Sequence, residues 1–267
     1  MSRLKQRIDS VFDAIERYKF QARWASGRLK PVTVIIPTIN SARYLDITLE
    51  YYRRMDVSPV IFVDAKTADQ TFQLASRLCQ HVHLLENSYE WVESLIERIS
   101  RSVATEWALR VDDDELPSRA VLEMCKHGMP ETAHSIVSLP RMNCGLTQSG
   151  QFAHNRRARD RQFRLYRVND VQYITAIHTP GFIVQRSLQL AHPHFLLHFD
   201  WAVRNYEERK AKVDRYNRVG GSAAGDRYRT AILFEENPKF RAQLLKAPEF
   251  TEVAKALAQR FPQSCVL

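Results

Sequence analysis

The chain has 267 residues, of which 45% are hydrophobic and 26% charged, a composition typical of a soluble globular protein. It contains no run of about 18 uncharged apolar residues, so no membrane-spanning helix is predicted. The N-terminus lacks the apolar core of a secretory signal, which predicts a cytoplasmic protein. The formal net charge of +9 favours anionic partners such as nucleotides, acidic membrane surfaces or nucleic acid. The four cysteines lie far apart, which argues against a zinc site or a disulfide framework.

Residues 1–29 are predicted to form an amphipathic helix that precedes the main domain. Leu4, Ile8, Phe12 and Ile15 recur at helical spacing. The segment up to Lys30 carries eight basic residues against three acids. A basic amphipathic helix can lie on an anionic membrane surface. The alternative is a helix that packs on the main domain and keeps its charges in water.

The next part of the chain alternates between short apolar runs, which are predicted strands, and helical segments. The predicted strands are residues 32–37, 59–64, 81–85 and 107–111. This alternation predicts an α/β fold with a mainly parallel sheet and helices on both faces. Ligands of such sheets bind at the carboxyl ends of the strands. Thr38, Asp64 and the acids that begin at Asp112 are all expected at that edge.

Four consecutive acids, Asp112, Asp113, Asp114 and Glu115, follow the last of these strands. Closely spaced like charges repel, so a compensating cation is expected nearby. If the strand twist continues beyond Val111, Asp112 and Asp114 share one face and Asp113 points away. Two converging carboxylates form a hard-oxygen site for Mg²⁺ or Mn²⁺, with open positions for substrate phosphates. The alternative is a solvated acidic turn that caps the next helix.

The sequence lacks the glycine-rich phosphate-binding motifs, so phosphates must be held by a metal and by basic side chains. Residues 156–167 contain six arginines around the single acid Asp160, and their second half alternates like a strand. Arginine forks match phosphate oxygens, so this segment can hold a diphosphate or an anionic acceptor. The alternative is a solvated basic strand face. His178 and His198 each follow a short apolar run, and each can complete the carboxylate site or lie hydrogen-bonded in the core.

The remaining segments predict structure rather than chemistry. Residues 135–139 are a predicted strand, and residues 141–155 are a predicted loop or hairpin. A charged helix is predicted over residues 205–219, followed by a glycine-containing break. The C-terminal part is predicted to hold two helical stretches that are split at Pro248.

Several of these segments together resemble the family 2 glycosyltransferases, which have the GT-A fold. Residues 32–40 (VTVIIPTIN) are similar to the opening strand of the family, and residues 62–69 (FVDAKTAD) to its second strand and nucleotide-binding turn. Residues 107–115 (WALRVDDDE) resemble the strand that ends in the Asp-x-Asp metal motif. Residues 160–167, 177–178 and 197–201 resemble later blocks of bacterial members that build envelope polysaccharides.

The resemblance implies roles for individual residues of this chain. Asp64 would contact the base or ribose of the donor nucleotide. Asp112 and Asp114 would hold Mn²⁺ or Mg²⁺ on the donor diphosphate, and His198 is a candidate third ligand. Further candidates for donor binding are Thr38, Asn40, Asp112, Asp113 and Arg164.

Inversion also needs a carboxylate that deprotonates the acceptor hydroxyl. The chain departs from the family here, because many relatives carry Glu-Asp or His-Glu at this step, whereas Thr179 follows His178. Asp160 is the predicted general base, since its arginine neighbours keep it ionised.

The sequence therefore predicts a metal-dependent, inverting glycosyltransferase with a nucleotide-diphosphate sugar as donor. The expected acceptor is a lipid-linked, lipopolysaccharide or other glycan at the inner membrane face, with peripheral contact to anionic lipid. One alternative is transfer to a modified base in DNA. Another is a non-catalytic nucleotide-sugar or nucleic-acid binding module. The predicted division is an N-terminal helix (1–29), a catalytic GT-A domain (30–204) and a helical C-terminal extension (205–267).

Overall fold

The computed structural model describes residues 29–86, 92–155, 160–176, 179–220, 229, 232–264 and 267. Residues 1–28 of the predicted N-terminal helix lie outside the described residues, as do residues 156–159 of the arginine-rich segment and His178. Within the described part of the chain, no helix is long and apolar enough to cross a membrane.

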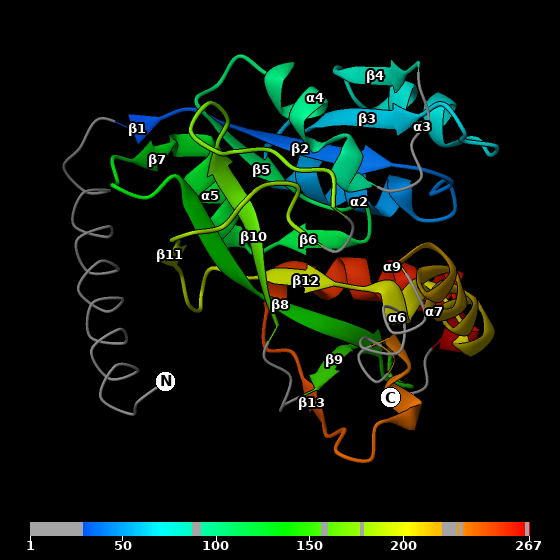
Figure 1. The fold of residues 1–267 in the computed structure, drawn as a ribbon. Helices are drawn as coiled ribbons and strands as arrows, with labels where there is room; N and C mark the ends of the chain where they lie inside the picture. Colours follow the sequence, from blue (N-terminus) through cyan, green and yellow to red (C-terminus); the bar gives the residue numbers. More distant parts are fainter. Residues whose placement is uncertain are drawn as a thin grey trace.

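Four parallel strands form the first half of the main sheet, in the order β5-β2-β3-β4 (Figure 1). They are β2 (Val32–Thr38), β3 (Val60–Asp64), β4 (Val82–Leu85) and β5 (Trp107–Arg110). The helical segments between them are α2 (Leu45–Arg54), α3 (Thr71–Leu78), the short 3₁₀ turn η1 (Val92–Ser94) and α4 (Ile96–Arg101). The predicted parallel strands are therefore confirmed.

Helices cover both faces of this sheet. Successive side chains of the buried strands point to opposite faces, and because they are apolar on both, each face needs a covering layer. On one face, Val34 and Ile36 of β2 pack in a core with residues of α2, α5 (Arg119–His127) and α9 (Thr251–Arg260). On the other face, Ile35 packs with Ile96 and Ile99 of α4. The α/β class with helices on both faces is thus confirmed.

The second half of the sheet is antiparallel, so the sheet as a whole is mixed. The order continues as β5-β10-β8-β9-β13, and every one of these pairings is antiparallel. The strands are β8 (Ile136–Leu146), β9 (Phe152–Asn155), β10 (Asp160–Arg167) and β13 (Ala242–Leu244). Residues 141–155 were predicted to be a loop or hairpin, and they contain a hairpin: β8 and β9 pair antiparallel across a short turn. β8 is longer than its predicted strand, since it pairs with neighbours on both edges.

Two short strands join the acidic run to the second half of the chain. β12 (Leu196–His198) lies between β6 (Glu115–Pro117) and β8, antiparallel to the first and parallel to the second. The register places His198 opposite Glu115 on one side and opposite Asn143 on the other. Residues about 80 positions apart in the chain are therefore neighbours where the acidic run ends.

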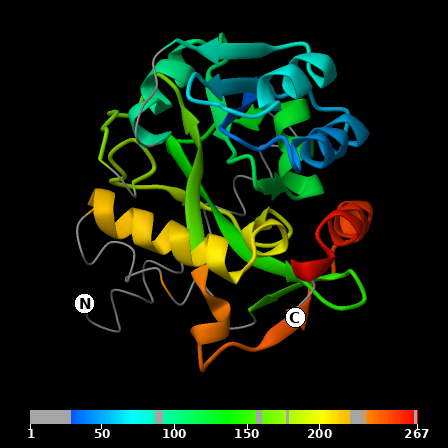
Figure 2. The same cartoon turned by 90° about the vertical axis from the view of Figure 1, so that its right-hand side faces the viewer.

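The C-terminal part packs around this junction. α6 (Asp200–Val203) follows β12 directly, and α7 (Tyr206–Gly220) lies across the side of the molecule that faces the viewer in Figure 2. α9 packs on α2, and Tyr51 of α2 stacks on Phe250 at a ring distance of 5.3 Å. Before Pro248 the chain forms the 3₁₀ turn η2 (Phe234–Glu236) and then β13, so the first of the two predicted C-terminal helical stretches is wrong over residues 237–247.

The remaining elements are small. β1 (Leu29–Lys30) pairs with β7 (Met129–Pro130) in a separate two-stranded sheet, and β11 (Leu188–Gln189) pairs with β8. The 3₁₀ turns η3 (Pro248–Phe250) and η4 (Pro262–Ser264) flank α9.

Candidate active site

The four acids form a turn at the carboxyl end of β5. The strand ends at Arg110, and the backbone N–H of Glu115 donates to the carbonyl of Asp112 at 2.9 Å, which closes the turn. A turn does not alternate its side chains between two faces as a strand does. The expectation that the strand twist continues beyond Val111 is therefore wrong, and Asp112, Asp113 and Asp114 have three different sets of partners.

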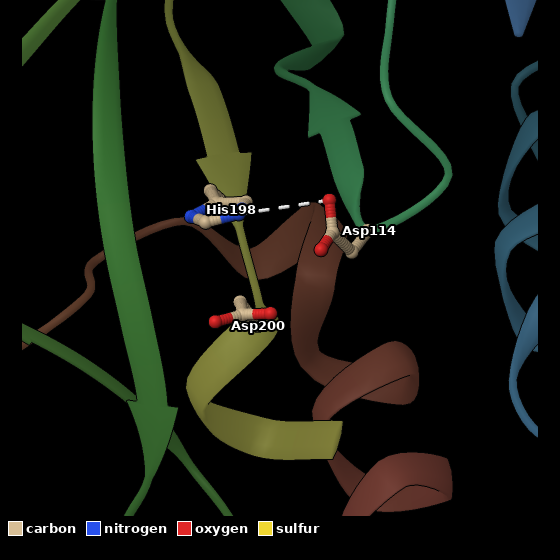
Figure 3. Close-up of side chains that lie close together, drawn as sticks. All are labelled: Asp114, His198 and Asp200. Atoms are coloured by element: carbon tan, nitrogen blue, oxygen red, sulfur yellow. Dashed lines mark ion pairs between the residues drawn. The ribbon is translucent and has the colours of Figure 1, made fainter. Parts of the chain in front are cut away.

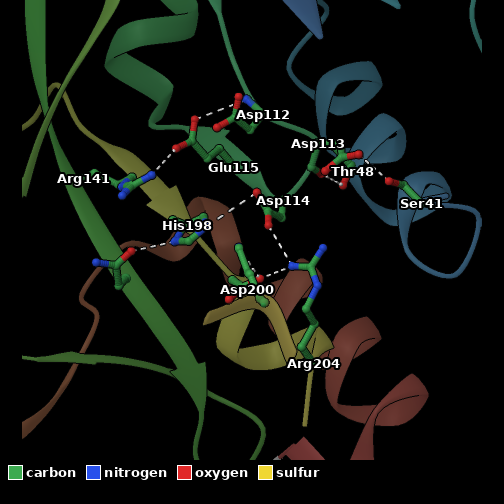
Figure 4. A network of polar contacts seen from close by, with 12 residues as sticks. Ser41, Thr48, Asp112, Asp113, Asp114, Glu115, Arg141, His198, Asp200 and Arg204 are labelled. Carbon is green, nitrogen blue, oxygen red and sulfur yellow. Dashed lines mark hydrogen bonds and ion pairs between the residues drawn. The ribbon is translucent and has the colours of Figure 1, made fainter. Parts of the chain in front are cut away.

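Asp113 faces the turn that follows β2. Its carboxylate accepts hydrogen bonds from Thr38 Oγ1 at 2.6 Å, from the Ser41 hydroxyl, and from the Tyr44 hydroxyl at 3.1 Å. Burial raises the pKa of Asp113 to about 6, and the charge of Asp114 adds to this effect. The hydrogen bonds from Ser41 and Thr38 act in the opposite direction. Asp113 therefore ties the acidic turn to β2, and its carboxylate lies beside Ser41 (Figure 4).

Asp112 lies in a buried network of arginines and acids. It pairs with Arg164 of β10, whose Nη2 also donates to Glu115 at 2.9 Å. Arg141 of β8 joins two of the acids: its Nη1 lies 3.1 Å from Glu115 Oε1, and its Nε lies 2.7 Å from Asp160 Oδ2. Asp112 Oδ1 and two nitrogens of Arg164, Nε and Nη1, have no hydrogen-bond partner among the described residues. This network thus contains buried polar atoms with unused hydrogen-bonding capacity, and Arg110 Nη2 lies 4.0 Å from Asp112 Oδ1.

Asp160 is held in this network by both of its oxygens. Oδ2 accepts from Arg141 Nε and Oδ1 from Gln162 Nε2, the latter at 2.9 Å. Burial acts to raise the pKa of Asp160, but the charge and hydrogen bond of Arg141 outweigh it and the pKa lies below its usual range. Asp160 is therefore ionised at neutral pH, and its side chain is 26% exposed.

Asp114 contributes to a group of side chains that can bind a metal ion. Asp114, His198 and Asp200 each offer one ligand atom, and these atoms lie within 4.8 Å of one another (Figure 3). Asp112 is not part of this group. Asp114 and His198 come from the acidic turn and the end of β12, and Asp200 is the first residue of α6. Two carboxylates and an imidazole form a donor set that fits Mn²⁺.

The orientation of His198 supports metal binding. Its Nδ1 lies 2.6 Å from Asn143 Oδ1, an acceptor, so the hydrogen of a neutral imidazole is on Nδ1. The other nitrogen, Nε2, then carries the lone pair and lies 3.6 Å from Asp114 Oδ1. In the neutral ring this lone pair can bind a cation placed between the two atoms, whereas a proton on Nε2 forms an ion pair with Asp114 in its place. Metal-binding histidines are commonly fixed in this way through their second nitrogen.

Two basic residues also contact these acids. Arg204, which follows α6, donates through Nη1 to Asp114 Oδ2 at 3.0 Å and also pairs with Asp200. Lys212 of α7 lies 3.0 Å from Asp200 Oδ1. Burial acts to raise the pKa of Asp114, but nearby charges, those of His198, Lys212 and Arg204, hold it well below its usual range. In Asp200 the charges of Lys212 and Arg204 likewise outweigh burial and lower the pKa. Both carboxylates are therefore ionised.

The other predicted donor-binding residues lie at the carboxyl ends of β2 and β3. Asp64 ends β3 and is 7% exposed, and its Oδ1 accepts from the backbone N–H of Lys66 at 2.8 Å. Asn40 has a positive φ of 52°, and its Oδ1 accepts from the N–H of Ala68 at 2.7 Å. This bond links the turn after β2 to the turn after β3, so Thr38, Asn40 and Asp64 lie along one edge.

The residues that sequence reasoning missed come from the second half of the chain. Asn143, Arg204 and Lys212 were not predicted as site residues, and Asp200 was not predicted as a metal-binding residue. A weak signal exists for Arg204, which follows Asp200 by four positions and comes directly after the short helix α6. Asn143 lies in a segment predicted to be a loop or hairpin, where the direction of its side chain could not be predicted.

The family model for glycosyl transferase family 2 matches residues 33–189 of the chain. No curated protein matches it. Among solved structures, the chain is similar to S. aureus TarS 1–349, with 13% identity over 88% of this chain and 82% of that one and a TM-score of 0.44. A TarS 1–349 complex with UDP-GlcNAc gives 14% identity, 78% and 72% coverage and a TM-score of 0.46. Glucosyl-3-phosphoglycerate synthase from Mycobacterium tuberculosis is 14% identical over 46% of this chain and 47% of that one, with a TM-score of 0.34.

The family match covers more than half of the chain and includes β2, β3, β5 and the acidic turn. It confirms the resemblance drawn from the sequence. This protein belongs to glycosyl transferase family 2 and is a glycosyltransferase.

Proposed function

We propose that this glycosyltransferase uses a nucleotide-diphosphate sugar and a divalent metal ion, and that it transfers the sugar with inversion to a hydroxyl of a glycan acceptor. The observation that carries the proposal is the group of Asp114, His198 and Asp200 at the carboxyl end of the parallel strands. In open α/β sheets, ligands bind at this edge.

Asp114 and His198 are the proposed protein ligands of Mn²⁺ or Mg²⁺, and Asp200 is a further candidate. The fit rests on Nε2 of His198, which faces Asp114 because Nδ1 is engaged by Asn143 Oδ1, so that a metal can take the place of a proton on Nε2. When bound, the metal would offset the negative charge that develops on the leaving diphosphate. Asp112 also remains a proposed ligand, since its Oδ1 has no hydrogen-bond partner within the described part of the chain.

The donor nucleotide is proposed to lie along the ends of β2 and β3. Asp64 would accept a hydrogen bond from the base or ribose, and Thr38 and Asn40 would shape the turn beside it. Asp113 keeps that turn in place through Thr38. Arg164 is proposed to bind the donor with its unpartnered Nε and Nη1 atoms, because arginine N–H groups match phosphate and hydroxyl oxygens.

Asp160 is the proposed general base. Of the two acids that Arg141 contacts, Glu115 is fully buried, whereas the Asp160 side chain is 26% exposed and can reach an acceptor. Its low pKa keeps it ionised but lowers its basicity. The acceptor hydroxyl would have to displace Gln162 or Arg141 from one carboxylate oxygen.

The proposed acceptor is a lipid-linked or lipopolysaccharide glycan at the inner face of the membrane. The support is the excess of basic residues before Lys30 and in residues 156–167, which favours contact with acidic lipid and with acceptor phosphate. On this proposal residues 1–29 are the membrane-contacting segment, and residues 205–267 form a C-terminal extension of the catalytic domain.

The test is a hydrolysis screen of nucleotide sugars with the full-length protein in Mn²⁺, in Mg²⁺ and in EDTA. We expect release of free sugar and nucleoside diphosphate from one donor or a few donors, only when a metal is present. The variant Asp64→Asn should weaken the use of the preferred donor. Equal release in EDTA would contradict the metal-dependent mechanism, and no release or binding of any donor would contradict the proposed donor class.

A further inference from the structure

The metal-binding group contains a guanidinium that contacts both of its carboxylates. Arg204 Nη1 donates to Asp114 Oδ2 at 3.0 Å and pairs with Asp200 Oδ1 (Figure 4). A cation between Asp114 Oδ1 and His198 Nε2 would bind the same carboxylate whose Oδ2 Arg204 now engages. The Asp114 and Asp200 side chains are 9% and 2% exposed, so little water is present to screen the two positive charges from each other.

The two carboxylates of this group already have positively charged partners without a metal. Arg204 pairs with both Asp114 and Asp200, and Lys212 lies 3.0 Å from Asp200. A divalent ion placed beside Arg204 would be repelled by the guanidinium at short distance. Arg204 and the metal therefore compete for Asp114.

Arg204 can leave Asp114 without leaving a buried acid unpaired. Asp200 keeps Lys212 as a partner at 3.0 Å, and the metal would replace Arg204 at Asp114. The Arg204 side chain is 24% exposed, and the residue lies between α6 and α7 rather than within a helix. A displaced guanidinium thus remains beside the metal site, where the anionic part of the donor must lie.

We propose that Arg204 is a further donor-binding residue, which exchanges Asp114 for a phosphate oxygen of the donor when the metal ion and the diphosphate bind together. This inference rests on the proposed metal site at Asp114. Arginine matches phosphate oxygens through paired N–H groups. In the free protein the same side chain lowers the affinity for the metal alone, so metal and diphosphate bind cooperatively.

The exchange predicts effects of opposite sign in one variant. Arg204→Gln removes the competing charge, so Mn²⁺ alone should bind about tenfold more tightly or better. The same change removes a phosphate ligand, so the Mn²⁺–pyrophosphate complex should bind about tenfold more weakly, the size expected for one charge-assisted hydrogen bond. A residue with a purely structural role would weaken both.

The experiment measures free Mn²⁺ by electron paramagnetic resonance and Mn²⁺–pyrophosphate binding by calorimetry, both with the full-length protein. Arg43→Gln is the matched control, because Arg43 pairs with Glu208 of α7 at 2.7 Å and the change removes one charge near the same helix. The control should leave both affinities within about twofold of the wild type, since exposed ion pairs contribute little. The melting temperature of each protein is measured with and without Mn²⁺, and Arg204→Gln should show the larger rise.

The outcomes separate this inference from the proposed function. If Mn²⁺ binds the wild type and Arg204→Gln equally, or binds the variant more weakly, the exchange is overturned while the metal site stands. If Arg204→Gln binds Mn²⁺ more tightly but pyrophosphate equally well, the competition stands and the donor-binding role is overturned. If no variant binds Mn²⁺ with or without pyrophosphate, the metal site and the exchange are both overturned.

Discussion

Asn143 is expected to determine the metal affinity without touching the metal. Its Oδ1 lies 2.6 Å from His198 Nδ1, which directs Nε2 toward Asp114 and, in the neutral ring, favours the tautomer with the lone pair on Nε2. Asn143→Leu keeps the branched shape of this buried side chain but removes the acceptor. The imidazole can then carry its hydrogen on Nε2 and donate to Asp114, and in that form it cannot bind a metal. Loss of such a partner lowers metal affinity about 10- to 100-fold, which corresponds to about 1.4–2.7 kcal/mol.

The assay is a Mn²⁺ titration followed by electron paramagnetic resonance, together with ¹⁵N NMR of the histidine rings to identify the tautomer. Asn155→Leu is the matched control. Asn155 and Asn143 are both 8% exposed, and Asn155 Oδ1 accepts from the backbone N–H of Arg241 rather than from His198. The reasoning is refuted if Asn143→Leu keeps wild-type Mn²⁺ affinity, or if both variants lose affinity equally.

Three further predictions concern the base, the acidic turn and the N-terminal segment. Asp160→Asn should lower turnover by roughly 10² to 10⁴ with little change in donor affinity, and near-normal turnover would leave Asp200 as the next candidate base. Because the pKa of Asp113 is raised to about 6 in the folded protein, its contribution to stability is present at low pH and is lost as pH rises from about 4 to about 6. Relative to wild type, the unfolding free energy of Asp113→Asn should therefore increase by about 2 kcal/mol between pH 4.5 and pH 7.5 in urea titrations, and no pH-dependent difference would contradict the raised pKa. Deletion of residues 1–29 should abolish salt-sensitive binding to acidic liposomes but preserve donor hydrolysis; tight binding to duplex DNA without lipid preference would instead favour a DNA acceptor.

The parallel half of the fold could be predicted because each strand is a short buried run followed by a polar turn. Residues 32–37 and 59–64 are apolar on both faces, as strands covered by two helical layers must be. The length of β8 could not be predicted in this way. Pro140, Asn143 and Gly145 are typical of loops, and pairing with β10, β12 and β9 overrides that preference.

The candidate site was predicted in part. Asp114 and His198 could be selected because a carboxylate and an imidazole each follow an apolar strand. The separation of Asp112 from Asp114 could not be predicted, because it depends on a turn that is closed by the backbone hydrogen bond of Glu115. Arg204 and Asn143 come from segments that reach the acidic turn only through the pairing of β12 with β6 and β8. No local spacing in the sequence encodes that pairing.

The central claim is that Asp114 holds a metal ion on a nucleotide-diphosphate donor. The most direct measurement is the affinity of the full-length protein for its preferred nucleotide sugar, by calorimetry, with Mn²⁺ and with EDTA. In the wild type we expect affinity to fall at least tenfold in EDTA, and in Asp114→Asn we expect the same weak affinity under both conditions. Equal affinity with and without Mn²⁺ in the wild type would contradict the claim, as would an undiminished effect of Mn²⁺ in Asp114→Asn.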